Sequence, residues 1–276
     1  MPKPTLYTFA KSSWSASARI ARIELDLCDV IEERQLDFLK AENMSPEYIR
    51  MTPNATIPAL STYTHVYRDT TEVIDYMASV SGVKAAPRTR LTAVVHHSSI
   101  DAKFMAFAAR NEKELAAKAA LGPPLLALTS RLPRIRVYAA SPQAAPFSEK
   151  YATKIADVEQ LLAIYTFSAP AAVMSNFYAT SQAVHDAARV FLYETLPGAI
   201  GSGPFVAGAV PGVDDFHTAT WVVHAGFLSG GQRTDDIISA LERRYGEKLS
   251  EKLTRFLRAW MMRESFKKTY VGGLIW

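Results

Sequence analysis

The chain has a single cysteine, Cys28, among its 276 residues. One thiol excludes an internal disulfide and any zinc site built from several cysteines. The sequence therefore predicts a reduced intracellular compartment, most simply the cytoplasm. Cys28 lies about four helical turns along from the start of the first predicted helix. It is expected to be buried and inert.

The chain also lacks the segments that direct proteins to membranes. It has no run of about 18 uninterrupted apolar residues, so no membrane span is expected. No secretory signal is expected either, because a strand begins by Thr5 with no apolar segment before it. The formal net charge of +4 is modest for this length and does not by itself imply a nucleic-acid partner.

Patterns typical of metal and phosphate sites are missing as well. His97 and Asp101 lie four residues apart, as two ligands on one helix face would, but no third ligand has a fitting spacing. The segment Gly201-Ser202-Gly203 lacks the strand, helix and lysine that accompany a phosphate-binding loop. We therefore expect neither a metal site nor a phosphate loop.

Strands and helices alternate in the first 80 residues. Apolar runs predict strands at 5–9, 32–39, 57–61 and 65–67. Helical periodicity predicts helices at 16–27 and 70–80. Prolines limit any helix between 40 and 56 to about one turn. This order predicts a small α/β layer.

The strand pattern stops at residues 81–87, which form the best linker candidate. Beyond it only helices are expected, beginning with one at 88–118. The proline-rich stretch at 122–146 is expected to form a loop, either alone or around a short helix. The later helices are predicted near 148–167, 176–196, 214–228, 235–246 and 249–268. The sequence thus predicts two domains, an α/β domain at 1–81 and an all-helical domain at 88–276.

The turn between the first strand and the first helix is rich in serine, with Ser12, Ser13 and Ser15 around Trp14. A hydroxyl there lies near unpaired backbone N–H groups at the positive end of a helix, where an anion is stabilised. A thiolate bound at this turn would have a lowered pKa and would accept a hydrogen bond from a serine. The alternative is that these serines only cap the helix.

Two further local features point to a peptide ligand. Ile57-Pro58 opens an apolar strand, where a cis-proline would turn the preceding backbone N–H and C=O toward an extended peptide. A trans-proline at the start of an edge strand is the alternative. Asp69-Thr70 begins the next helix, so Asp69 could bind an ammonium group, and Thr70 with the helix N–H groups could bind a carboxylate. A helix that is merely capped is the alternative there.

The order of these features resembles the glutathione transferase superfamily over nearly the whole chain. The serine turn, the strand start Ile57-Pro58-Ala59-Leu60 and the helix start Asp69-Thr70 follow the family's motifs. Pro204-Phe205-Val206-Ala207-Gly208 looks like part of its buried capping segment. The resemblance implies an α/β plus all-α fold, a thioredoxin-like N-terminal domain followed by an all-helical domain. The Ser-Ser-Trp turn looks most like fungal serine-type members.

The resemblance also implies an activity, a co-substrate and site residues. It implies a cytosolic, homodimeric glutathione S-transferase that conjugates glutathione to a small apolar or aromatic electrophile, as in detoxification. Counting back from Arg19 places Ser12 at the catalytic position, with Ser13 as the near alternative. The implied substrate-binding residues are Trp14, Lys40, Ile57, Pro58, Asp69 and Thr70. The resemblance implies no metal.

The chain departs from the family pattern near the expected ligand. Ser13 stands where the family usually has proline. Ala55-Thr56 replaces a Gly-Lys or Gly-Gln pair that donates to the glycine carboxylate of glutathione, and Lys40 is the candidate substitute. Two alternative functions therefore stay open. One is a non-catalytic ligand-binding member, and the other is a specialised glutathione-dependent etherase or isomerase in a metabolic pathway.

Overall fold

The computed structural model describes residues 3–272. These residues form two units, each with its own internal contacts. The first contains residues 3–34, 57–106 and 184–272, and the second contains residues 35–56 and 107–183. The predicted fold class is confirmed, because named strands occur only up to residue 67 and the later elements that the structure describes are helices. The domain limits 1–81 and 88–276 stay a prediction.

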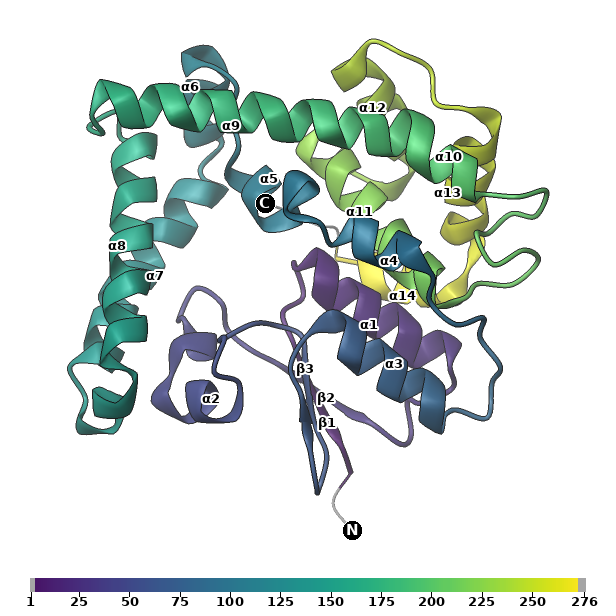
Figure 1. Ribbon diagram of the computed structural model, residues 1–276, viewed down its shortest axis with the longest axis horizontal. Coiled ribbons are helices and arrows are strands. Elements are labelled where there is room, and N and C mark those ends of the chain that lie inside the picture. Colours follow the sequence, from purple (N-terminus) through teal and green to yellow (C-terminus); the bar gives the residue numbers. More distant parts are fainter. Residues whose placement is uncertain (1–2, 273–276) are drawn as a thin grey trace. The chain divides into compact units, whose positions relative to one another are not determined.

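The N-terminal part of the chain forms a four-stranded sheet with the strand order β2-β1-β3-β4 (Figure 1). Its strands are β1 Thr5–Thr8, β2 Glu32–Gln35, β3 Ala59–Ser61 and β4 Val66–Tyr67. Strand β3 runs antiparallel to β1 and β4, and Leu60 of β3 lies opposite Leu6 of β1. Both leucines are fully buried, because alternate strand residues share a face and this face is covered by helices.

Helices α1 (Ser13–Glu24) and α3 (Thr70–Val80) lie beside the sheet (Figure 1). Apolar residues recur every three or four positions, so each helix buries one stripe of side chains. Ile20 of α1 and Val73 of α3 are fully buried in the same apolar cluster as Leu60. Each helix begins at a residue whose side chain caps it, Ser12 for α1 and Asp69 for α3.

Helix α1 ends at Glu24 and does not continue to Leu27 as the sequence predicts. Asp26 adopts a left-handed conformation with φ of 54°, which turns the chain out of the helix. Cys28 therefore lies in a turn and is exposed, so the prediction of a buried cysteine is wrong. Leu27 is the buried residue of this turn.

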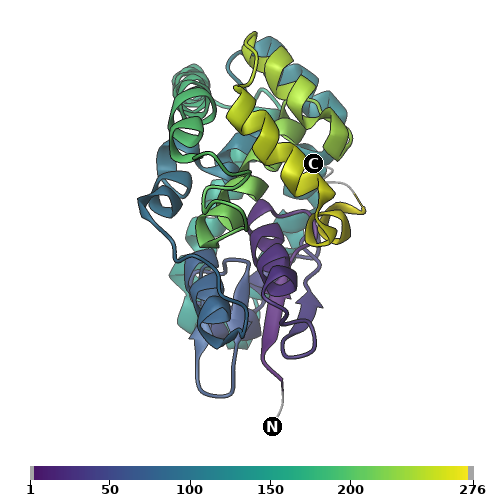
Figure 2. The same ribbon diagram turned by 90° about the vertical axis from the view of Figure 1, so that its right-hand side faces the viewer.

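Helices make up the rest of the first unit, and most of the predicted ones are present. They are α4 Arg90–Val95, η2 Ser98–Ile100, α5 Ala102–Phe107, the π-helical turn η4 Phe191–Thr195, α10 Leu196–Ala199, α11 Val213–Leu228, η5 Thr234–Asp236, α12 Ile237–Tyr245, α13 Glu251–Met262 and α14 Glu264–Tyr270. The single helix expected at 249–268 is divided at Arg263, whose Nε donates to the Glu24 carboxylate at 2.7 Å. This bond connects the junction between α13 and α14 to α1, and α14 packs beside α1 (Figure 2).

Helix α11 is buried at every residue from Val213 to Gly226. It packs against α1 and α4. Its polar side chains therefore need partners inside the protein, because water does not reach them. Trp221 Nε1 donates to the carbonyl of Ile100 at 2.9 Å, and His224 Nε2 donates to the carbonyl of Ala102 at 3.0 Å.

Asp215 holds the start of α11 to the loop before it. Its carboxylate is fully buried and accepts hydrogen bonds from the backbone N–H groups of Val206 at 2.6 Å, Ala207 at 3.0 Å and Gly212 at 2.9 Å. Gly212 has no side chain to cap the helix, so the carboxylate and the backbone make this connection alone.

Asp214 ties the same helix start to α4. Its carboxylate accepts from the backbone N–H groups of Thr89 and Thr92, each at 3.1 Å or less, and from the Thr92 hydroxyl at 2.6 Å. Two adjacent buried carboxylates thus satisfy backbone donors on two different segments, which fixes where α11 begins.

The second unit joins a short segment from the first sixty residues to a set of helices. Its elements are η1 Glu42–Met44, α2 Pro46–Met51, α6 Glu112–Leu121, α7 Pro123–Ala139, η3 Pro142–Phe147, α8 Ser148–Tyr165 and the larger part of α9 Ala171–Val190. Helices α7 and α8 pack along each other (Figure 1). The Tyr151 hydroxyl of α8 donates to the Met44 carbonyl at 2.6 Å, which attaches the short segment to the helices.

The loop predicted at 122–146 is wrong, because most of it is helix α7. Pro123 and Pro124 lie in the first turn, where a missing N–H group costs no helical bond. Pro133 lies inside the helix and removes one backbone bond. Leu132 and Ile135 are nevertheless buried, so packing of this face outweighs the local cost.

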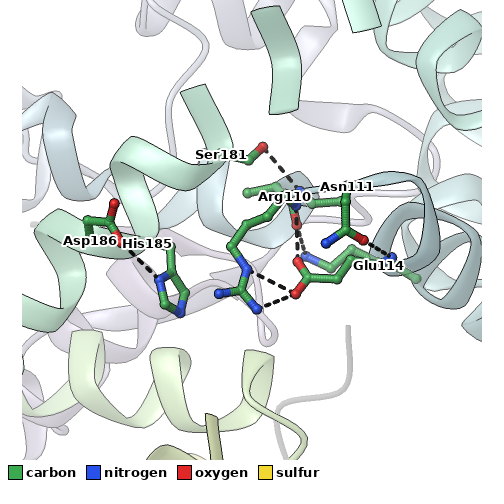
Figure 3. Close-up of polar contacts among 9 residues, drawn as sticks. Arg110, Asn111, Glu114, Ser181, His185 and Asp186 are labelled. Atoms are coloured by element: carbon green, nitrogen blue, oxygen red, sulfur yellow. Dashed lines mark hydrogen bonds and ion pairs between the residues drawn. The ribbon is translucent and has the colours of Figure 1, made fainter. Parts of the chain in front are cut away.

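The continuous helix predicted at 88–118 is also wrong, because new helix starts interrupt it. At one of them, Asn111 caps α6 by accepting from the Glu114 N–H at 2.9 Å, and Glu114 accepts from the Arg110 N–H at 3.0 Å (Figure 3). Arg110 and Glu114 also form an ion pair. The Ser181 hydroxyl accepts from the Ala109 N–H at 3.1 Å beside them. This reciprocal capping begins a new helix.

Replacing Asp215 with alanine should lower the free energy of unfolding by about 3 kcal/mol, because three buried N–H groups would lose their acceptor. Urea denaturation followed by circular dichroism would measure this change. Asp235→Ala is the matched control, because Asp235 is exposed and pairs only with Arg233, and it should cost less than about 0.5 kcal/mol. Equal effects of the two substitutions would contradict the anchoring role of Asp215.

Candidate functional site

All the predicted site residues except Lys40 lie in the first unit. Ser12 is the N-cap of α1, and its Oγ accepts from the Ser15 N–H at 3.2 Å. Ser12 therefore caps the helix, and its side-chain oxygen accepts the capping hydrogen bond. The cap does not use the Ser12 hydroxyl proton, which donates to no residue that the structure describes. Ser12 is half-buried, so this proton remains available to a ligand.

Ser13 and Ser15 have different surroundings from Ser12. Ser15 is fully buried, and its Oγ accepts from the Phe9 N–H at 3.0 Å, which closes the turn after β1. Ser13 is 4% exposed and its hydroxyl forms no hydrogen bond within residues 3–272. The turn therefore holds two hydroxyl groups that can donate to a ligand, and the Oγ of Ser12 is the one that a backbone bond orients.

Trp14 connects the serine turn to α4. Its ring stacks on the ring of His96, with centroids 4.0 Å apart and an interplanar angle of 23°. Trp14 is half-buried, which leaves part of the indole at the surface of the turn. The stacked pair thus connects the serine turn to the end of α4.

The Ile57-Pro58 peptide bond is cis, as the first of the two hypotheses from the sequence predicts. Strand β3 begins directly after it, at Ala59. The backbone N–H and C=O of Ile57 form no hydrogen bond with any residue of the described chain. A donor and an acceptor on one residue are thus available to pair with an extended peptide.

Asp69, and not Thr70, caps helix α3. The Asp69 Oδ1 accepts from the Glu72 N–H at 2.9 Å, and Glu72 accepts from the Arg68 N–H at 2.9 Å in return. Asp69 is exposed and keeps its other carboxylate oxygen free of these bonds. Thr70 is 6% exposed and stands in the first turn. The helix start therefore combines an anionic group with backbone donors, which suits a zwitterionic ligand.

Lys40 lies in the second unit, on an exposed turn. Its ammonium group pairs with the Asp37 carboxylate at 3.1 Å, and the Lys40 N–H donates to Asp37 at 3.0 Å. The backbone N–H bond from Lys40 lowers the pKa of Asp37, and the Lys40 ammonium group adds to this effect. The lysine side chain is 66% exposed, so the pair is weak and the ammonium group can exchange partners.

The segment Ala55-Thr56 is held by side chains of the second unit. Asn43 Nδ2 donates to the Ala55 carbonyl, and the Tyr48 hydroxyl donates to the Thr56 carbonyl, both at 2.8 Å. Ala55 has a φ of 54°, a left-handed conformation that costs an alanine free energy. These two bonds hold the chain in this conformation up to the residue before Ile57.

Arg131 of α7 extends this network. Its Nη2 donates to Asn43 Oδ1 at 3.1 Å, its Nη1 donates to the Phe38 carbonyl, and its guanidinium carbon lies 3.6 Å from the centre of the Phe38 ring. No carboxylate of the described chain pairs with it. Burial without a counter-ion lowers the pKa of Arg131 to about 10, so the side chain stays charged at neutral pH.

The sequence interpretation missed a pair of histidines next to the serine turn. His96 Nε2 and His217 Nδ1 are 2.9 Å apart, and His217 is fully buried in α11. Burial lowers the pKa of His96 to about 4, against a smaller opposite effect of the Asp69 carboxylate. Burial also lowers the pKa of His217 far below 6.5, and nearby His96 and Arg88 lower it further. Both rings are therefore neutral at pH 7.

The described residues contain no group of three or more His, Cys, Asp or Glu side chains placed to hold a metal ion. Within the same residues, no helix has both the length and the apolar character that crossing a bilayer requires.

The histidine pair should make stability depend on pH. In the unfolded chain each histidine binds a proton near pH 6.5, whereas folded His96 binds one only near pH 4. The unfolded state then holds more protons between these values, so the free energy of unfolding should fall as pH decreases from 6.5 to 4. Each histidine contributes up to about 1.4 kcal/mol per pH unit.

Urea denaturation at several pH values would measure this dependence. His217→Asn should reduce the slope, because asparagine does not titrate, while the exposed His65→Gln control should leave it close to that of the native protein. An unchanged slope in His217→Asn would contradict the assignment of this dependence to the pair.

Arg131→Met should loosen the segment 35–56 without a large change in global stability, because it removes two hydrogen bonds and also a costly buried charge. The Ala55 N–H, which donates to the Thr52 carbonyl at 2.8 Å, should exchange with deuterium about tenfold faster. Arg136→Met on the same helix is the control, because Arg136 is exposed and pairs with Glu159. Equal exchange in both variants would contradict the network.

Comparisons with known proteins concern the N-terminal domain and the fold. Residues 11–80 match the family model of the glutathione S-transferase N-terminal domain. The chain is similar to the solved structure of a glutathione transferase homolog from Sulfitobacter with bound glutathione, at 17% identity, with 100% of each chain covered and a TM-score of 0.51. No curated protein matches the chain.

Two further solved structures are similar over almost the whole chain. One is Gtt2 from Saccharomyces cerevisiae, at 16% identity, covering 96% of this chain and 99% of that one with a TM-score of 0.53. The other is the beta-etherase LigF from Sphingobium sp. strain SYK-6, at 14% identity, covering 99% of this chain and 100% of that one with a TM-score of 0.57. At these identities the likeness shows a shared fold.

Proposed function

We propose that the chain is a glutathione S-transferase of the glutathione transferase superfamily, because residues 11–80 match the family's N-terminal domain. In this proposal the enzyme joins the glutathione sulfur to a small apolar or aromatic electrophile. The observation that carries it is the Ser12 hydroxyl, which stands at a helix start with its oxygen held by the cap and its proton free to donate.

Ser12 acts as a hydrogen-bond donor to the glutathione thiolate. The positive end of α1 and the hydroxyl both stabilise the anion, so the thiol loses its proton to solvent more readily on binding. The thiolate then attacks the electrophilic carbon and forms the C–S bond. A leaving group departs with its electron pair, or a proton from solvent completes an addition. Ser13 is a second hydroxyl donor at the same turn, so the experiment tests Ser12 and Ser13 separately.

The tripeptide is held by groups on either side of the serine turn. The free N–H and C=O of Ile57, beside Pro58, pair with the backbone of the central cysteine residue of glutathione. Asp69 takes the ammonium group of the γ-glutamyl end, and Thr70 with the first N–H groups of α3 takes its carboxylate. Trp14 covers the ligand at the turn, and the role of Lys40, which belongs to the second unit, stays a prediction from the sequence.

Ser12→Ala should lower kcat/KM for thiol conjugation to a generic electrophile by about a hundredfold, because a donor to the anion is lost. It should also raise the pKa of bound glutathione, which ultraviolet absorbance of the thiolate reports. Ser13→Ala should change both quantities far less. Ser250→Ala is the matched control, because Ser250 caps α13 by accepting from the Leu253 N–H at 3.2 Å and has no part in the site.

The possible results separate the candidate functions. Activity that survives Ser12→Ala and falls in Ser13→Ala would transfer the donor role to Ser13. A native protein that fails to bind glutathione at millimolar concentration, measured by calorimetry, would contradict the proposed function and favour a non-catalytic ligand-binding role. Conjugation by the native protein with loss in Ser12→Ala alone is the expected outcome.

A further inference from the structure

The His96–His217 pair lies within the first unit and has no part in the function proposed above. His96 is linked to two site residues, because its ring stacks on Trp14 and the Asp69 carboxylate raises its pKa. Its second ring nitrogen, Nδ1, forms no hydrogen bond with any residue that the structure describes. Since His96 is half-buried, that nitrogen is open to a ligand or to solvent.

The protonation state of this nitrogen decides what it can bind. A neutral imidazole carries one proton, so one nitrogen donates and the other accepts. If Nδ1 of His96 carries the proton, it can bind a carboxylate. If Nδ1 is bare, it can bind an ammonium group. The bond to His217 fixes this choice, because the two rings share one hydrogen between His96 Nε2 and His217 Nδ1.

His217 determines which nitrogen donates. Its other nitrogen, Nε2, is buried and has no hydrogen-bond partner. If His217 accepted from His96, its own proton would be on Nε2, leaving a buried N–H donor without an acceptor, which proteins rarely tolerate. The favoured arrangement therefore has the proton on His217 Nδ1, donating to His96 Nε2. His96 then carries its proton on Nδ1.

Nearby charges act on the pair as well. The Asp69 carboxylate favours protons on His96. Arg88, the charged group that acts on His217, makes a second proton on the pair unfavourable. His96 is thus a neutral donor whose proton position is set by a residue that no ligand touches.

We propose that His96 is a further ligand-binding residue of this site, whose Nδ1–H donates to the carboxylate of an amino-acid end that has its ammonium group on Asp69. This inference rests on the proposed function, because the γ-glutamyl group of glutathione is the amino-acid end concerned. His217 is a positioning residue, because it acts only through the proton position of His96. The pair would make the site select ligands that keep both the ammonium and the carboxylate group.

Calorimetric titration of the purified protein with two ligands tests the contact. The ligands are glutathione and its analogue with 4-aminobutyrate in place of the γ-glutamyl residue, which lacks only the α-carboxylate. His96→Phe keeps the stacking on Trp14 and should raise the Kd for glutathione about tenfold or more. His96→Asn keeps a donor near the position of Nδ1 and should recover most of this loss. Neither variant should change the Kd for the analogue by more than about twofold.

A control and a pair of variants separate this contact from a structural effect. The control His65→Gln removes an exposed histidine on the hairpin and should leave both Kd values unchanged. His217→Phe removes the donor toward His96 Nε2 and should raise the Kd for glutathione, whereas His217→Asn keeps a donor there and should recover most of this loss. Equal loss of both ligands in His96→Phe would overturn the proposal, as would an unchanged Kd for glutathione.

The proton position on His96 can also be measured in the native protein, so this test does not depend on whether a variant folds. Long-range nitrogen–proton NMR correlations of protein labelled with ¹⁵N-histidine report which nitrogen of His96 is protonated. Protonation of Nδ1 is expected, and protonation of Nε2 would overturn the proposal. Native protein that binds no glutathione would overturn both this inference and the proposed function, whereas binding that is insensitive to His96→Phe would overturn this inference alone.

Discussion

The burial of helix α11 on all sides constrains the rest of the first unit. A polar group inside this helix has no water to bind, so it needs an internal partner at a fixed place, a need that Nε2 of His217 leaves unmet. Asp214 and Asp215 meet this need at the helix start, and Trp221 and His224 meet it further along. The segments that provide the partners are thereby positioned as well, including α4, whose last turn leads to the candidate site.

Local sequence signals predicted most of the fold. The strand at 5–9, the helix at 70–80 and the helix at 148–167 follow from hydrophobic periodicity and from residues that begin or end an element. Two of the errors concern residues 88–146. Prolines predicted a loop at 122–146, whereas α7 forms because its Leu132 and Ile135 side chains are buried. Helical periodicity predicted one helix at 88–118, whereas α6 starts afresh because Asn111 caps it and Glu114 accepts from the Arg110 N–H.

The candidate site divides in the same way. Ser12, Ile57 and Asp69 could be found from the sequence because a turn, a proline and a helix start are each written in a few adjacent residues. The partnership of His96 with His217 could not, because it joins positions 121 residues apart and depends on how α4 packs on α11. The same applies to Arg131, whose partners Phe38 and Asn43 lie in a distant segment.

Cys28 gives the molecule a practical property that a buried cysteine would not. It is the only thiol of the sequence and it is exposed, so a maleimide dye or a spin label would attach to one position of the first unit. A second label on a cysteine introduced at an exposed position of the second unit would then report the distance between the two units in solution. Spectroscopy of such a doubly labelled chain, with and without glutathione, would show whether ligand binding changes that distance.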